Sequence, residues 1–192
     1  MNLSPLLIAT IVVAVLVVLV AVWAIRTFNV LIRQRNQVRA SWAQIDVQLK
    51  RRHDLVPNLV ETVKGYAGHE RTTLDAVVAA RAGAMAAGAD PSVDRRAAAE
   101  GMLTQTLGRL FALAEAYPDL KANQNFLALQ SELANTEDKI AYARQFYNTA
   151  VQALDNSAHS FPSLFVAGAT GIKPPAYFQA SGAEQSPVQV RF

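Results

Sequence analysis

Residues 6–25, LLIATIVVAVLVVLVAVWAI, form an unbroken run of twenty residues without a charge. As an α-helix such a run covers roughly 30 Å, the thickness of the hydrocarbon core of a bilayer. A cleaved signal peptide has a basic N-terminal region and a shorter apolar run that ends in small residues, whereas here MNLSP precedes the run and Trp23 and Arg26 lie at its exit. The sequence predicts a retained transmembrane helix; a buried helix of a soluble protein is the alternative.

The charges that flank the run predict its orientation. Four arginines follow it within fifteen residues, without an acid among them, while the five residues before it are uncharged. The positive-inside rule then places the N-terminus outside and the rest of the chain in the cytoplasm. The residues expected at the membrane interface, with anionic lipid beside the bases, are Trp23, Arg26, Phe28, Arg33, Arg35 and Arg39.

Composition and motifs argue against most kinds of catalytic or cofactor-binding site. There is no cysteine, and His69-Glu70 lacks the second histidine of a zinc-protease motif. No nucleophile elbow, dinucleotide fingerprint or phosphate-binding loop is present. We therefore expect a protein that is not an enzyme, with no catalytic residue, no cofactor and no metal site.

A net charge of +3 and a pI near 9.4 do not by themselves predict nucleic-acid binding. The bases that could neutralise phosphates are Arg33, Arg35, Arg39, Lys50, Arg51 and Arg52. Four of the first seven bases after the predicted span lie within fifteen residues of it, where topology and anionic lipid explain them. We expect no nucleic-acid partner.

A long amphipathic helix follows the span. Its apolar residues step by three and four, with an apparent miss at Arg52. The seam consists of Val38, Trp42, Ile45, Leu49, Val56, Leu59, Val63 and Tyr66. Pro57 lies inside this helix, and because the seam keeps its phase on both sides, it predicts a kink and not a stop.

The next boundaries are less sharp. Two alternatives are compatible with the pattern. The helix continues to about residue 87, or it ends in a turn at 65–68 and Thr72 or Thr73 caps a new helix. GADPSVD at 88–94 is a breaker, with Asp90 or Ser92 as the cap of a helix that runs to about Ala116.

The last helix has the most regular pattern, a heptad repeat that steps by three and four without a slip from Phe126 to Leu154. Phe161-Pro-Ser ends it, and the Gly- and Pro-rich tail predicts a loop or an ordered irregular strap. The fold class is all-α: a transmembrane helix that continues into an antiparallel bundle of three to four helices. The expected organisation is an outer N-terminus (1–5), the span (6–25), a cytoplasmic bundle (26–160), and an apolar segment with an irregular tail (161–192).

Two small groups of residues are candidate contacts for a second copy or a partner. Ala80 and Ala84 lie in an alanine-rich segment that allows close helix approach, either inside the bundle or between protomers. Phe161, Leu164 and Phe165 could cap the bundle core, or press on a membrane or a neighbour.

The segments RRHDLVPNLVETVKGYAGHE (51–70), AEAYPDLKANQNFLALQSELANTEDKIAYARQFYN (114–148) and NSAHSFPSLFVAG (156–168) resemble the LemA family, as does the ending PVQVRF. The resemblance implies a single-pass bacterial membrane protein with an antiparallel helical bundle and no established catalysis. It also implies partners such as an HtpX-like membrane metalloprotease or TPM-domain proteins; one branch takes part in forming magnetosome membranes.

Two hypotheses of function follow. The first is a membrane-anchored scaffold that forms homo-oligomers through its bundle, with Pro57 shaping the helix. The second is an adaptor or regulator of a membrane-associated protease or of an envelope stress or signalling system.

Overall fold

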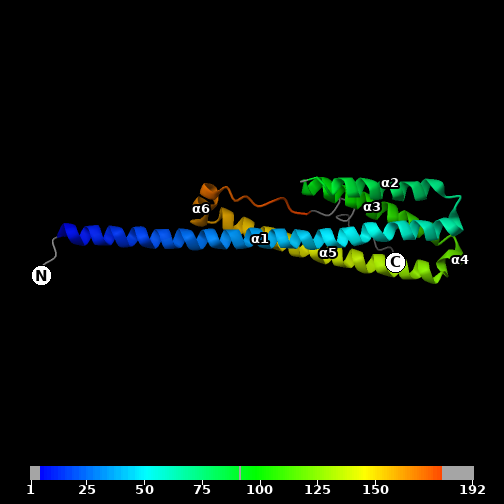
Figure 1. Ribbon diagram of the computed structural model, residues 1–192, viewed down its shortest axis with the longest axis horizontal. Coiled ribbons are helices and arrows are strands. Elements are labelled where there is room, and N and C mark those ends of the chain that lie inside the picture. The colour runs from blue at the N-terminus through cyan, green and yellow to red at the C-terminus, as the bar shows by residue number, and fades with distance from the viewer. Residues whose placement is uncertain (1–4, 91, 179–192) are drawn as a thin grey trace, which may run out of the picture. The chain divides into compact units, whose positions relative to one another are not determined.

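A computed structural model describes residues 5–90 and 92–178, and over these ranges the chain is helical and contains no strand. The helices are α1 (Pro5–Ala67), α2 (Arg71–Ala87), α3 (Val93–Ala114), α4 (Pro118–Lys121), α5 (Gln124–His159) and α6 (Ser163–Thr170) (Figure 1). The all-α prediction is confirmed. The expectations for residues 1–4 and 179–192 lie outside the described residues.

The chain divides into two compact units. Unit 1 contains Met1–Ala40 and Thr149–Pro175, and unit 2 contains Ser41–Asn148 and Ala176–Phe192. Helix α1 and helix α5 each contribute to both.

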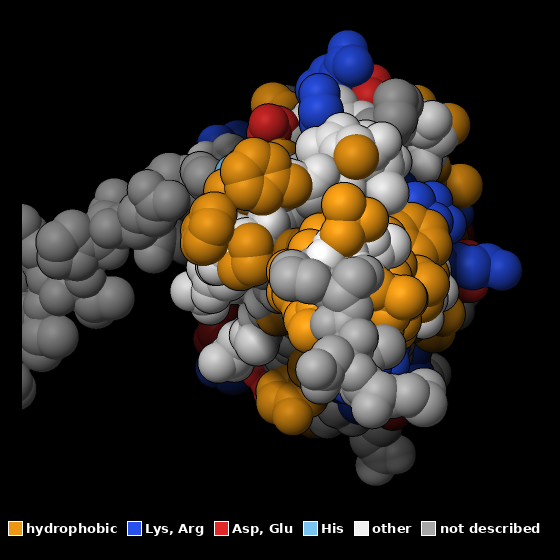
Figure 2. Space-filling view, turned by 90° about the vertical axis from the view of Figure 1, so that its left-hand side faces the viewer, with side chains coloured by type: hydrophobic (Ala, Val, Ile, Leu, Met, Phe, Trp, Pro, Cys, Tyr) orange, Lys and Arg blue, Asp and Glu red, His pale blue; other side chains and the backbone are white. Residues whose placement is uncertain are grey.

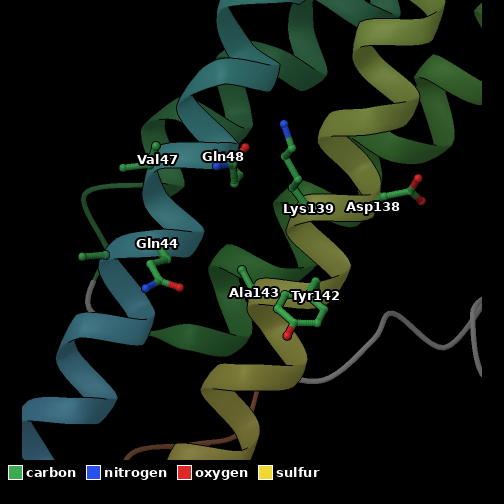
Figure 3. A pocket seen from close by; sticks show the side chains of 8 residues that line it. Gln44, Val47, Gln48, Asp138, Lys139, Tyr142 and Ala143 are labelled. Carbon is green, nitrogen blue, oxygen red and sulfur yellow. The ribbon is translucent and has the colours of Figure 1, made fainter.

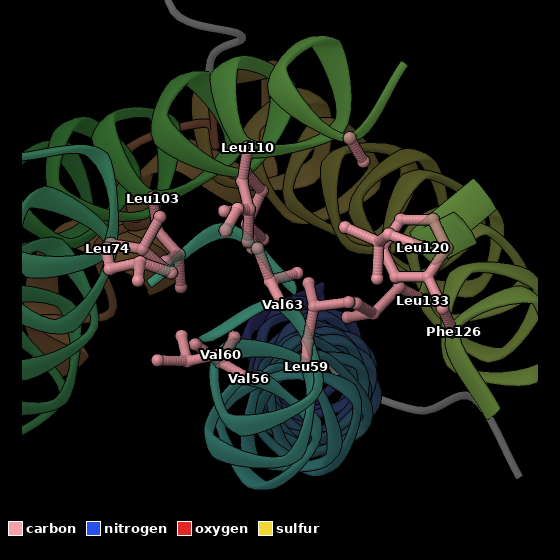
Figure 4. Packing of buried hydrophobic residues seen from close by; sticks show 14 of the residues in the cluster. Val56, Leu59, Val60, Val63, Leu74, Leu103, Leu110, Leu120, Phe126 and Leu133 are labelled. Carbon is pink, nitrogen blue, oxygen red and sulfur yellow. The ribbon is translucent and has the colours of Figure 1, made fainter. Parts of the chain in front are cut away.

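The hydrophobic core of unit 2 is built from one face of each long helix. α2 and α3 form an antiparallel pair, because only a short connection separates them, and α1 and α5 pack on the same core (Figure 4). Its buried members include Val56, Leu59 and Val63 of α1, Leu74 and Val77 of α2, Leu103, Leu107 and Leu110 of α3, Leu120 of α4, and Phe126 and Leu133 of α5.

The seam predicted on α1 is confirmed, with two corrections. Its apolar positions from Val38 to Val63 are buried, apart from the half-buried Trp42. Arg52, which we interpreted as a break in the apolar pattern, is buried in the same seam at 2 % exposure. Tyr66 is exposed, and the adjacent Ala67 occupies the last buried position instead.

The first helix ends at the glycine-containing turn. The carbonyl of Ala67 accepts a hydrogen bond from the backbone N–H of Glu70 (3.0 Å), and a Cβ on Gly68 would lie 3.0 Å from the carbonyl oxygen of Lys64. The cap that we expected at Thr72 or Thr73 is wrong. The carbonyl of Glu70 already accepts from the N–H groups of Thr73 and Leu74, so the helix begins earlier.

The other boundaries agree better with the sequence. Ser92 is the N-cap of α3, and its hydroxyl accepts from the backbone N–H of Arg95 (3.4 Å). α5 covers the predicted heptads, with buried residues from Phe126 to Leu154. The helix α6 was not predicted, because Pro162 and two glycines mask a short apolar helix in the sequence.

The chain after α6 is an irregular strap, and its last described residues are tied to α5 in unit 2. The Tyr147 hydroxyl donates to the carbonyl of Ala176 (2.9 Å), and burial raises the pKa of Tyr147 to about 12. The side chain of Asn148 bonds both the N–H and the carbonyl of Phe178. The Phe178 ring packs on Trp42 with 5.8 Å between ring centroids.

Pro57 lies within α1, and the carbonyl that it leaves without a helical donor belongs to His53. That carbonyl accepts a hydrogen bond from Nε of Arg81 on α2, at 2.7 Å. The proline thus creates an acceptor on α1 that α2 satisfies, so a local defect becomes a contact between helices.

We expect Arg81→Met to lower the free energy of unfolding by about 1–3 kcal/mol, because it leaves the His53 carbonyl without its donor. In a Pro57→Ala background the alanine N–H can serve that carbonyl, so the same substitution should cost less. Denaturant unfolding of the four combinations in detergent measures the difference. Arg71→Met, at an exposed position of the same helix, is the control, and an equal cost in both backgrounds would contradict the pairing.

Candidate functional site

Arg51, Arg52 and His53, at the start of segment 51–70, pair with carboxylates of other helices inside unit 2. The Arg52 guanidinium pairs with the carboxylate of Glu100 on α3, and its Nη1 lies 2.6 Å from Oε1 of Glu137 on α5. The same Nη1 donates to the hydroxyl of Thr104 at 3.0 Å. His53 Nε2 lies 3.0 Å from Oε1 of Glu100. We name Arg52, His53, Glu100, Thr104 and Glu137 the Arg52 cluster.

Burial determines how this cluster behaves. Glu100 is 7 % exposed, and its burial opposes ionisation. The hydrogen bond from His53 and the charge of Arg52 outweigh that burial and hold the pKa of Glu100 below its usual value. The carboxylate therefore stays charged at neutral pH beside a buried guanidinium.

The Arg52 cluster contains the residue types of an acid–base site. A pocket of about 290 Å³ between α3 and α5 meets the cluster only at Thr104 and Glu137 and is otherwise lined mainly by apolar side chains. The cavity that Arg52 and Glu100 line measures about 20 Å³ and is closed by Leu49, Ile140 and Phe178 among others. Such a volume holds about one water molecule. The cluster joins α1, α3 and α5, and we assign it to the interior architecture of the bundle.

An open groove of about 560 Å³ lies on another face of unit 2, between α1 and α5. Figure 3 shows Gln44 and Gln48 of α1 and Lys139 and Tyr142 of α5 around the space between the helices, with Asp138 pointing outward. The complete lining is Ala43, Gln44, Val47, Gln48, Asp138, Lys139, Tyr142 and Ala143.

Apolar side chains dominate this groove although it faces solvent. Tyr142 is 74 % exposed and Val47 is 63 % exposed. The Oε1 atom of Gln48 is buried and has no hydrogen-bond partner among the described residues. Among the residues that the structure describes, neither Asp138 nor Lys139 forms an ion pair. The groove therefore offers apolar area to a partner, together with the exposed charges of Asp138 and Lys139.

The sequence-predicted contact residues fall in different places. Ala84 is 1 % exposed and belongs to the core cluster, and Ala80 packs against that cluster. Both alanines thus fill the bundle interior of this chain. Phe161, Leu164 and Phe165 are exposed, on and just before α6 in unit 1.

The residues expected at the membrane interface lie on α1 within unit 1. Trp23 and Phe28 are each 38 % exposed, and Arg26, Arg33 and Arg39 are exposed as well, whereas Arg35 is half-buried. The apolar part of α1 is long and apolar enough to cross a membrane, and none of it is buried among the described residues.

Sequence reasoning missed two features of unit 2. Arg52 was taken as a break in a seam, although its heptad phase indicated burial. The groove was missed because Val47 and Tyr142 lie outside both seams and come together only when α1 and α5 pack side by side. No group of three or more His, Asp or Glu side chains that could hold a metal occurs in residues 5–90 and 92–178.

Glu100→Gln should lower the free energy of unfolding at pH 7 by about 3 kcal/mol, because it leaves the Arg52 guanidinium buried without its closest counter-charge. The lowered pKa of Glu100 means that its carboxylate stabilises the fold above the unfolded-state pKa, near 4.5, and that this contribution disappears as the pH falls through the folded-state value. The difference between wild type and Glu100→Gln should therefore shrink on acidification.

Denaturant titrations between pH 7 and pH 3 measure this difference. Glu115→Gln, at an exposed position, is the matched control and should change little. Replacing the pair together, Arg52→Met with Glu100→Leu, should recover much of the loss, because it removes both buried charges. A Glu100→Gln protein as stable as wild type at pH 7 would contradict the assignment.

Comparison with known proteins agrees with this architecture. The sequence model of the LemA family matches residues 41–192. The chain is 26 % identical to Protein LemA of Metamycoplasma hominis, with 82 % of this chain and 71 % of that protein aligned. It is 24 % identical to Magnetosome protein MamQ 2 of Paramagnetospirillum magneticum, over 84 % of this chain and 68 % of that protein.

None of these relatives carries the name of an enzyme, and the apolar start of α1 suggests a membrane anchor. The match covers the whole of unit 2 and includes segments 51–70 and 114–148, in which the resemblance to the family was noted. This chain is a helical protein that belongs to the LemA family.

Proposed function

We propose that this protein is a non-enzymatic scaffold of a bacterial inner membrane, anchored by residues 6–25 and assembled through the α1–α5 groove. The observation that carries the proposal is the groove itself, an exposed apolar surface beside the charges of Asp138 and Lys139, which are unpaired among the described residues. The surface, and not the buried Arg52 cluster, is where this molecule can act on others.

The anchor is supported by the uncharged helix and by the charges that follow it. Residues 6–23 of α1 are all exposed, as expected of a helix whose surroundings are lipid. The arginines that follow favour an outer N-terminus and a bundle in the cytoplasm. A green fluorescent protein fused to the C-terminus should fluoresce; a dark but stably exported fusion would contradict this orientation.

A second copy of the chain is the occupant that the groove fits. Asp138 and Lys139 are adjacent, exposed and without an ion pair among the described residues, so the face carries both charges. In a two-fold contact each patch meets itself, and Lys139 of one copy can then reach Asp138 of the other. Tyr142 would contribute apolar area at the centre of such a contact.

The relatives add a context for assembly at a membrane. Three of them are named as magnetosome proteins, MamQ. We infer for this chain the more general role of organising membrane or partner proteins, with no chemistry of its own. The tiny cavity at the Arg52 cluster supports the non-enzymatic part of the proposal.

Val47→Glu should weaken self-association of the full-length protein by at least about tenfold, because it buries an unpaired charge in the contact. Mass photometry in detergent or lipid nanodiscs reports the oligomer distribution. Val78→Glu is the matched control, since Val78 is a comparably exposed valine of α2, outside the groove.

Charge reversal provides a sharper form of this test. Lys139→Asp should weaken association, and adding Asp138→Lys should restore it, because the two charges then exchange places. A wild-type protein that stays monomeric at all concentrations would overturn the self-assembly. If that monomer recovers a stoichiometric membrane protein through the same groove, the adaptor hypothesis replaces the scaffold, with an HtpX-like protease or a TPM-domain protein as the first candidates.

A further inference from the structure

The short helix α6 turns its large apolar side chains away from the protein. Ala167 and Ile172 are buried, whereas Phe161 is 78 % exposed and Phe165 is 63 % exposed. Amphipathic helices of soluble domains do the reverse and direct their bulky apolar face to the core. We name the exposed set of Phe161, Leu164 and Phe165 the α6 outer face.

This outer face is continuous and uncharged. The rings of Phe161 and Phe165 meet edge to face, with 6.0 Å between their centroids. No charged residue occurs from Ser160 to Ile172. An exposed apolar patch of this kind marks a surface that contacts another apolar phase.

Hydrogen bonds within unit 1 place α6 near the end of the apolar run of α1. The amide of Gln34 donates to the hydroxyl of Ser157 at 2.8 Å, which fixes the last turns of α5 beside α1. The hydroxyl of Ser163, at the start of α6, donates to the carbonyl of Ser157 at 2.6 Å. α6 is therefore held close to the part of α1 that follows residue 25.

The burial pattern of α1 agrees with this placement. Every residue from 6 to 23 is exposed, Ala24 and Thr27 are half-buried, and Leu31 is fully buried. Figure 1 shows α6 beside the blue part of α1, and Figure 2, which looks onto the end where α1 begins, shows hydrophobic side chains gathered at the centre of the view. The α6 outer face thus lies where the apolar surface of α1 ends.

The charges of unit 1 suit a lipid surface. Its basic residues are Arg26, Arg33, Arg35, Arg39 and Lys173, against the single acid Asp155. Bases close to an anionic membrane are attracted to its surface. An uncharged helix with exposed phenylalanines, carried by a basic unit, has the composition of a segment that enters the headgroup region.

We propose that the α6 outer face inserts into the bilayer interface beside the span, as a second membrane contact of the same chain. The proposal rests on the anchor proposed above. Because α1 already ties the protein to the bilayer, the additional contact serves to fix how unit 1 is oriented at the membrane surface.

Single cysteines test this directly, since the chain has none of its own. The full-length protein carries Phe165→Cys or Phe161→Cys with an environment-sensitive fluorophore, in vesicles of phosphatidylcholine and phosphatidylglycerol. Val15→Cys is the reference within the span and Val78→Cys is the reference in water. Quenching is measured with doxyl groups at a shallow depth for the labels at 161 and 165, with doxyl groups near the bilayer centre for the label at 15, and with iodide in the buffer.

We expect labels at 161 and 165 to emit at shorter wavelength than the label at 78, to be quenched by the shallow lipid and to be protected from iodide. A blue-shifted label that the lipid quencher does not reach would assign the face to a second copy and overturn the proposal. Iodide quenching equal to that at 78 would place the face in water, with the same consequence. If the lipid quencher does not reach the label at 15 either, the proposed membrane anchor is wrong. If it reaches the label at 15 but not the labels at 161 and 165, the anchor stands and only the α6 contact is overturned.

Discussion

The burial of the Arg52 guanidinium is the constraint around which unit 2 is organised. An arginine at 2 % exposure loses its hydration, and only well-placed counter-charges make this tolerable. Glu100 from α3 and Glu137 from α5 supply them, so the charge on α1 is satisfied only when three helices adopt one mutual register. A purely apolar seam tolerates a shift along the helix, whereas a buried ion pair does not. The cluster thereby favours one arrangement of the bundle.

This constraint gives the charged start of segment 51–70 a role inside the bundle. Arg52 lines a cavity of about 20 Å³, His53 contacts Glu100, and Pro57 leaves the carbonyl of His53 to accept from Arg81 of α2. Arg52 and His53 are engaged with Glu100 inside the protein. The surfaces that we propose as contacts with other molecules are the α1–α5 groove and the outer face of α6.

Much of the fold could be predicted from periodicity. The seams of α1 and α5, the Ser92 cap and the connection at 88–92 all depend on local sequence, and the structure agrees with them. The failures arose where a tertiary contact decides the outcome. Arg52 breaks the apolar pattern because its partners lie 48 and 85 residues away, and α6 was hidden by Pro162 and its glycines. The groove could not be predicted, since neither Val47 nor Tyr142 belongs to a seam.

The central claim is that this protein acts through contacts between copies at a membrane and not through chemistry. A spin label at Asn135→Cys, an exposed position of α5 that does not line the groove, measures this most directly by double electron–electron resonance in lipid nanodiscs or vesicles. A single label per chain reports only distances between copies. The account predicts a defined intermolecular distance that fades when labelled protein is diluted with unlabelled protein. A featureless background at every dilution, from folded protein in lipid, would contradict it.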